Sequence, residues 1–260
     1  FLGGLILFLL QYFFQVYGDW AWLYAWIFLS CFLILIQPLF TLFIAPIFNT
    51  FTPLEDGELK NRIILFAEKN NFPISRIDVM DGSRRSSKAN AYFSGLGKNK
   101  RIALFDTLIE KHSVDELLSI IAHEVGHYKM KHNIKGIIMG VVQSGFMLFM
   151  FSIFLNNAQL FSAFGMENVS VYASLLFFTL LYSPIELLLS LVGNKISRKH
   201  EFEADAFALN SIGTGKFLIE GLKKLTVTNL GNLTPHPLTV WLNYSHPPII
   251  ERIQALDDVD

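Results

Sequence analysis

Basic residues are missing from two long parts of the chain. No Lys or Arg occurs before Lys60, and none occurs between Lys135 and Lys195. The 21 basic residues nearly balance the 22 acidic ones, so no patch is basic enough to bind a phosphate backbone, and a nucleic-acid partner is excluded. The single cysteine, Cys31, lies inside an apolar run, which excludes a disulfide framework.

The two parts without basic residues are strongly apolar. Residues 1–17 and 20–48 form one pair of apolar runs, and residues 134–155 and 170–192 form another. The later two are long enough to cross a hydrocarbon core, which needs about 20 helical residues, and only helices satisfy their backbone in lipid at that length. We therefore predict a mainly α membrane protein with four transmembrane helices, rather than a soluble protein with buried helices.

The positions of the basic residues also predict an orientation. The links at residues 18–19 and 156–169 contain no basic residue, so they should face away from the cytosol, and both polar blocks should lie on the cytosolic side. The chain opens inside an apolar run without the features of a signal peptide, and we expect an N-terminal part to precede it. These expectations divide the chain into residues 1–48, 49–133, 134–192 and 193–260.

The first polar block, residues 49–133, predicts two helices and a small sheet. A capping box at residues 52–55 predicts a helix to about Lys69, and another at residues 113–116 predicts a helix to about His132. Three short strands are expected at residues 74–80, 89–93 and 101–105, the last two joined by a loop containing Gly95 and Gly97. An exposed edge of this sheet could pair with an extended peptide.

The second of these helices contains the motif HExxH at residues 123–127. Its two histidines, His123 and His127, lie one turn apart on one face, so both imidazoles can reach one metal ion. Glu124 lies about 100° round the helix from His123, which is unsuitable for a third ligand but suitable for taking a proton from an attacking water. The spacing indicates a zinc site of the metalloprotease type, although such a motif also arises by chance.

A catalytic zinc needs a third protein ligand. In the segment that continues the last apolar run, four polar residues fall within an arc of about 60° on a helix, namely Asn194, Arg198, Glu201 and Asp205. We assign Glu201 to the metal and Asp205 to orienting one histidine, with Arg198 balancing the carboxylates or holding substrate. A solvated salt-bridge face is the alternative, and Glu203 and His246 are the next candidate ligands.

The remaining histidines carry weaker signals. His112 and His132 bracket the HExxH helix, and we expect both at the surface. His246 lies in a loop before a short helix; it could stabilise an oxyanion or be an ordinary loop histidine.

Taken together, these segments resemble the type I CAAX prenyl endopeptidases, which are membrane zinc proteases with a gluzincin-type site. The segments that carry the resemblance are IAPIFNTFTPLEDGELK at 44–60, SSKANAYFSGLGKNKRIALFDTL at 86–108, IAHEVGHYKMKH at 121–132, SRKHEFEADAFA at 197–208 and YSHPPIIERIQAL at 244–256. HExxH followed by ExxxD and SHPPxxER is far narrower than HExxH alone. His200 departs from the family, which usually has an aromatic residue there.

The resemblance implies roles for individual residues. His123, His127 and Glu201 would bind Zn²⁺, Glu124 would be the general base, and Asp205 would support a ligand. Two further roles are implied, for Asn90 in binding the substrate backbone beside the edge strand and for His246 in the transition state. The polar segments would form a cytosolic α+β zincin-like catalytic domain with a small sheet, attached to the last four helices of a larger bundle.

The implied function is that of an integral-membrane zinc metalloendopeptidase acting on prenylated proteins that end in CaaX. An HtpX-like protease that degrades damaged membrane proteins is the nearest alternative, and a non-catalytic membrane scaffold is a third. The implied partners are a peptide or protein substrate and membrane lipid. The implied location is the endoplasmic reticulum membrane in a eukaryote or the inner or plasma membrane in a prokaryote.

Overall fold

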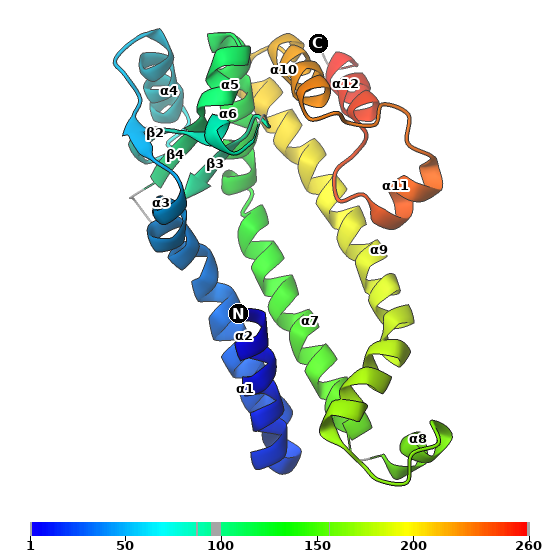
Figure 1. Ribbon diagram of the computed structural model, residues 1–260. Coiled ribbons are helices and arrows are strands. Elements are labelled where there is room, and N and C mark those ends of the chain that lie inside the picture. The colour runs from blue at the N-terminus through cyan, green and yellow to red at the C-terminus, as the bar shows by residue number, and fades with distance from the viewer. Residues whose placement is uncertain (1, 87, 95–99, 156, 259–260) are drawn as a thin grey trace. The chain divides into compact units, whose positions relative to one another are not determined.

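The structure is a computed structural model that describes residues 2–86, 88–94, 100–155 and 157–258 (Figure 1). It divides into two compact units, one of Phe1–Gln37 with Ile134–Leu189 and one of Pro38–Asn133 with Ser190–Asp260. We call them the apolar unit and the polar unit. The predicted loop at Gly95 and Gly97 lies outside the described residues.

The apolar unit is built from helices. They are α1 (Leu2–Val16), η1 (Gly18–Trp20), nearly all of α2 (Ala21–Leu39) and of α7 (His132–Leu155), α8 (Ala158–Ala163), and the part of α9 (Val171–Ile212) up to Leu189. Among the described residues, α7, α9 and the segment Gly18–Ile36 are long and apolar enough to cross a membrane, whereas the helical segment Gly3–Val16 is shorter. A mainly helical protein with several membrane-capable helices is therefore confirmed, and the count of four spans stays a prediction.

Aromatic side chains fill the interior of the apolar unit. Phe151 packs edge-on against Phe14 and Phe178, with ring centroids 4.8 and 5.3 Å apart. The indole nitrogen of Trp26 donates to the carbonyl oxygen of Val141 at 2.8 Å. A Cβ at Gly145 would lie 2.8 Å from that nitrogen, so the absence of a side chain at Gly145 lets α2 and α7 make this contact.

The polar unit contains a four-stranded mixed sheet in the order β1-β2-β4-β3. Its strands are β1 (Phe51–Pro53), β2 (Ile74–Met80), β3 (Ala91–Ser94) and β4 (Lys100–Phe105). β2 and β4 are parallel, whereas β1 and β3 pair antiparallel with their neighbours. The three predicted strands are therefore confirmed, and β3 forms one edge of the sheet.

The predicted helix start at residues 52–55 is wrong. Thr52 and Pro53 belong to strand β1, and the backbone N–H of Leu54 donates to Ile77 on the neighbouring strand at 2.9 Å. The side chain of Leu54 is buried in the core, so strand pairing and burial outweigh the local capping signal. Helix α4 begins later, at Glu58, and ends at Lys69 as expected.

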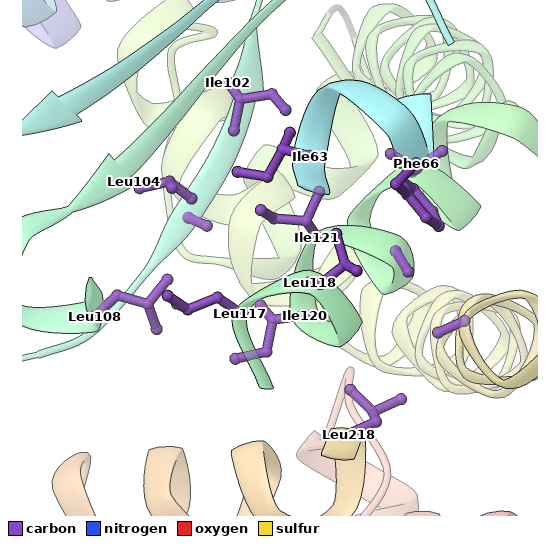
Figure 2. Packing of buried hydrophobic residues seen from close by; sticks show 14 of the residues in the cluster. Ile63, Phe66, Ile102, Leu104, Leu108, Leu117, Leu118, Ile120, Ile121 and Leu218 are labelled. Atoms are coloured by element: carbon purple, nitrogen blue, oxygen red, sulfur yellow. The ribbon is translucent and has the colours of Figure 1, made fainter. Parts of the chain in front are cut away.

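Helices α4 and α6 (Val114–Lys129) pack with the sheet in one hydrophobic core (Figure 2). Ile63 from α4, Ile102 and Leu104 from β4, and Leu117 and Ile121 from α6 are almost completely buried there. The second predicted capping box is confirmed, because Ser113 Oγ accepts from Glu116 N and Glu116 Oε2 accepts from Ser113 N. The start of α6 is thus fixed by its cap, and its inner face by the core.

Helix α9 continues without interruption from its apolar part into the polar unit, as predicted, and ends before Gly213, whose φ is +92°. The remaining helices described in the polar unit are η2 (Phe40–Ile44), α3 (Ala45–Phe48), η3 (Gly82–Arg84), α5 (Asp106–Lys111), α10 (Lys216–Thr228), α11 (Pro237–Asn243) and α12 (Ile249–Asp257). Leu218 and Leu222 of α10 join the same core as α6. Ala208 and Leu209 of α9 belong to this core as well, so the last part of α9 and α10 are both held near the HExxH helix.

Candidate metal centre

Three side chains from α6 and α9 converge in the polar unit. His123 Nε2 lies 3.1 Å from His127 Nε2, and the two nitrogens lie 3.6 and 3.4 Å from the carboxylate oxygens of Glu201. A tetrahedral zinc ion with bonds of about 2.0–2.1 Å separates neighbouring ligand atoms by about 3.3 Å. These three residues therefore fit a divalent metal, and they are one of two His/Glu groups among the described residues that could hold one.

Close approach of two backbones brings the three residues together. Gly126, inside the HExxH motif, faces Ala204 on α9, and a Cβ at Gly126 would lie 3.0 Å from the Ala204 Cα and 3.1 Å from the Phe207 Cβ. A glycine at this position lets α6 and α9 touch without a side chain between them. Because Glu201 lies one turn before Ala204, this contact sets its distance from the histidines.

Gly126→Ala should therefore push the two helices apart. Extra methyl groups in a packed interior typically cost about 1–3 kcal/mol, so we expect a lower midpoint of thermal unfolding together with weaker metal binding. Gly136→Ala is the matched control, because a Cβ at this glycine of α7 meets nothing within 4 Å. Equal midpoints and equal metal affinities for the two variants would show that the contact does not position Glu201.

His123 is oriented by a carboxylate and an arginine behind it. Its Nδ1 lies 2.7 Å from Asp205 Oδ1, and Arg252 of α12 donates to both oxygens of Asp205, from Nε at 2.7 Å and from Nη2 at 2.6 Å. Asp205 thus accepts a hydrogen bond from the Nδ1–H of His123, which leaves Nε2 without a proton and facing Glu201. The structure brings Asp205 to the position that the helical stripe predicted.

Arg252 is a site residue that the sequence analysis missed. Its guanidinium also lies 3.4 Å from Glu201 Oε2, and the side chain is buried. Burial alone lowers the pKa of Arg252, but its hydrogen bonds to Asp205 and the charges of Asp205, Glu201 and Glu124 outweigh burial and raise it. Its only signal in the sequence was a charged residue at the end of SHPPxxER, four residues before the buried Leu256.

Glu124 follows His123 on α6 and is half-buried. Burial of its carboxyl group raises its pKa, and the positive charges of His123 and His127 only partly oppose this, while Glu201 adds to it. A carboxyl group with a raised pKa takes up a proton more readily than an ordinary glutamate, which suits a general base.

His246 reaches the same site from the loop before α12. Its Nε2 lies 3.5 Å from Glu201 Oε1, and its imidazole is largely exposed. The loop is held to α9, because Arg198 Nη1 donates to the carbonyl oxygens of Tyr244 and Val240, and Asn194 donates to that of Leu242. Arg198 therefore contacts the backbone of the segment that carries His246. Of its two expected roles, balancing the carboxylates finds no support, since no ion pair of Arg198 occurs in the described part of the chain, and holding substrate stays a prediction.

Asn90 lies directly before the edge strand β3 and is exposed. Its Oδ1 accepts from the backbone N–H of Ala91 at 2.9 Å, and its carbonyl oxygen accepts from Phe105. The structure places Asn90 at the sheet edge, where the family resemblance implied it, and these contacts tie it to the sheet.

The expectation that His112 and His132 lie at the surface is wrong. His112 is buried, with its Nδ1 donating to the carbonyl oxygen of Leu108. His132 is also buried, between His127 and Glu203. His112 bonds within its own stretch of chain, whereas His132 is covered from α9, which helical spacing within α6 alone does not reveal.

Comparison with known proteins agrees with these motifs. Residues 53–260 match the family model described as peptidase family M48, and residues 1–50 match the one described as CAAX prenyl protease N-terminal, five membrane helices. The CAAX prenyl protease 1 homolog of Homo sapiens is 36% identical over 95% of this chain, and CAAX prenyl protease 1 of Saccharomyces cerevisiae is 37% identical over 99%. In each case the chain spans 60% of the relative's length.

A solved structure is similar as well. The crystal structure of Ste24p from S. mikatae superposes with a TM-score of 0.89 at 35% identity, covering 98% of this chain and 63% of that one. The match to the M48 model covers most of the chain and contains both HExxH and the ExxxD segment. The resemblance drawn from the motifs is thereby confirmed, and the chain belongs to peptidase family M48.

Proposed function

We propose that the protein is an integral-membrane zinc metalloendopeptidase that processes the C-terminal peptides of prenylated CaaX proteins. The observation that carries this proposal is the spacing of His123 Nε2, His127 Nε2 and the Glu201 carboxylate, at 3.1–3.6 Å from one another. Membership of a metallopeptidase family supports a metal, and two imidazoles with one carboxylate are the ligand set of known catalytic zinc sites.

In this proposal each residue has a separate task. When bound to His123, His127 and Glu201, zinc would polarise the scissile carbonyl group and make water more acidic. Glu124 removes a proton from the attacking water and delivers it to the leaving amine. Asp205 and Arg252 keep His123 in the tautomer that frees its Nε2.

Substrate binding would use the sheet edge and the loop before α12. An extended peptide that pairs with β3 would gain backbone hydrogen bonds, and the exposed side chain of Asn90 could hold one of its peptide groups. The exposed imidazole of His246 lies close to Glu201, where a ring N–H could donate to the negative charge that develops on the carbonyl oxygen.

Two features bear on the choice of substrate. The segments NAYF at 90–93, DAFA at 205–208 and FTPL at 51–54 favour the CAAX-like branch over an HtpX-like quality-control protease. The curated relatives are named CAAX prenyl protease 1. A non-catalytic membrane scaffold agrees less well with the sequence, because it would have no use for the carboxylate of Glu124.

The proposed placement follows from charge. Four membrane spans would leave both basic blocks, and with them the metal site, on the cytosolic side. The membrane would be that of the endoplasmic reticulum in a eukaryote, or the inner or plasma membrane in a prokaryote. Lipid would then contact exposed apolar residues of the spans, such as Val142, Leu176 and Leu188.

The test compares three substrates for the purified full-length protein in lipid vesicles. We expect cleavage of a farnesylated CaaX peptide after the modified cysteine, with much slower cleavage of the same peptide without the farnesyl group and of an unfolded membrane protein. Mass spectrometry of the products locates the cut. Preferred degradation of the unfolded protein would favour the quality-control function. If all three substrates stayed intact, a non-catalytic membrane scaffold would be favoured.

A further inference from the structure

His132, the first residue of α7, lies between a proposed metal ligand and a carboxylate. Its Nδ1 is 3.0 Å from His127 Nδ1, and its Nε2 is 2.9 Å from Glu203 Oε2. Only 5% of His132 is exposed, so water does not replace these contacts. The three side chains form a continuous row, which we call the His127–His132–Glu203 row.

The protons of this row are fixed if His127 binds a metal through Nε2. A metal-bound imidazole carries its remaining proton on the other nitrogen, so His127 Nδ1 would donate. His132 Nδ1 must then accept, which leaves the His132 proton on Nε2, facing the Glu203 carboxylate. Every donor in the row has an acceptor, and a single arrangement of protons satisfies all of them.

We propose that His132 and Glu203 are positioning residues that hold His127 in the orientation needed for zinc binding. They would do for His127 what Asp205 and Arg252 do for His123. The two histidines of the HExxH motif would then have separate supports, Asp205 and Glu203, both from α9. This inference rests on the proposed zinc site, because His127 has to be a ligand for its orientation to matter.

A different reading is that His132, His200 and Glu203 themselves hold a second metal ion. The ring geometry is unfavourable for this, since the His132 and His200 rings stack with centroids 3.9 Å apart and an interplanar angle of 11°. The lone pair of an imidazole nitrogen lies in the ring plane, so an ion between two stacked rings lies outside both planes. The stack instead braces His132 from one side.

The experiment measures zinc affinity by competition with a chelator, which does not depend on catalysis. Removing the outer partner of a metal ligand typically weakens metal binding about 10–100-fold, and we expect that loss for His132→Phe, which keeps the ring but cannot accept from His127. Glu203→Ala should weaken zinc binding in the same direction, whereas Glu203→Gln should restore affinity, because its amide oxygen still accepts from His132. Both Glu203 variants lose the charge that faces Lys199 at 3.6 Å, so this pair is matched.

His200→Phe separates the two readings. It keeps a ring stacked on His132 but removes both ring nitrogens of residue 200, so zinc affinity should stay at the wild-type level with one zinc per chain. Two zinc ions per wild-type chain, with one lost in His200→Phe, would overturn the proposal in favour of the second metal. Wild-type affinity in Glu203→Ala, or equal losses in Glu203→Ala and Glu203→Gln, would also overturn it.

The result also distinguishes this proposal from the proposed function. If the wild-type protein binds no zinc, both the proposed function and the positioning role of the His127–His132–Glu203 row are refuted. If the wild type binds zinc and folded His132→Phe binds it equally tightly, the proposed function stands and the positioning role of His132 and Glu203 is refuted. If His132→Phe does not fold, as judged by circular dichroism, the two Glu203 variants give the answer.

Discussion

Glu124→Gln should keep zinc bound and lose nearly all peptide cleavage. Glutamine has almost the same shape as glutamate, so the helix and the three proposed ligands should stay in place. An amide cannot take a proton from water at neutral pH, and general acid–base catalysis contributes about 10²–10⁴-fold to a rate. The expected result is therefore a fall of this size in kcat with unchanged metal content.

The measurement combines turnover of the farnesylated peptide with metal analysis on the same preparation. Glu110→Gln is the matched control, because Glu110 is an exposed glutamate on the neighbouring helix α5, and the same chemical change there should leave both values as in the wild type. Normal turnover by Glu124→Gln would remove the proposed mechanism. Loss of zinc together with activity would instead assign Glu124 to metal binding.

Glu201→Ala should lower the zinc content and abolish activity. Two histidines alone hold zinc weakly, and the substitution also leaves Arg252 without the carboxylate at 3.4 Å. Loss of a direct ligand should weaken binding by more than the roughly 10–100-fold expected for an outer partner. The zinc affinity of Glu201→Ala should thus fall below that of Glu203→Ala, two residues further along α9.

Metal analysis after dialysis against buffer checks this order. A partly exposed glutamate of α10, Glu220, supplies a control in Glu220→Ala, which removes an ion pair with Lys223 away from the proposed metal site. If Glu201→Ala retained the full zinc content, the third ligand would have to be sought elsewhere, with Glu203 and His246 the next nearest candidates.

The sequence predicted which side chains share a face where a single helix carries the information. The spacing of His123 and His127 gives a shared face on α6, and the spacing of Glu201 and Asp205 gives a shared face on α9. Arg252 was missed because its role depends on how α12 packs against α9, across 47 residues of chain. His132 was wrongly expected at the surface for the same reason. Its hydrogen-bond partner Glu203 lies 71 residues later in the sequence.

Two capping-box patterns in the sequence had different outcomes in the fold. The capping box at residues 113–116 caps α6, whereas the one at residues 52–55 lies in and beyond strand β1. Burial of Leu54 and its bond to β2 decided the second case, and neither is visible in four residues of sequence. Local patterns therefore predicted which elements exist better than they predicted where α4 begins.

The hydrogen bonds of Arg252 have a consequence for the timing of synthesis. His123 meets Asp205 across 82 residues and Arg252 across 129, so a nascent chain has HExxH long before it has either support. Chains are made from the N-terminus at about 5–20 residues per second, so this interval lasts for several seconds or more. During translation, His123 therefore lacks its contact with Arg252 until α12 has been made, and the proposed metal site is complete only after the last helix packs.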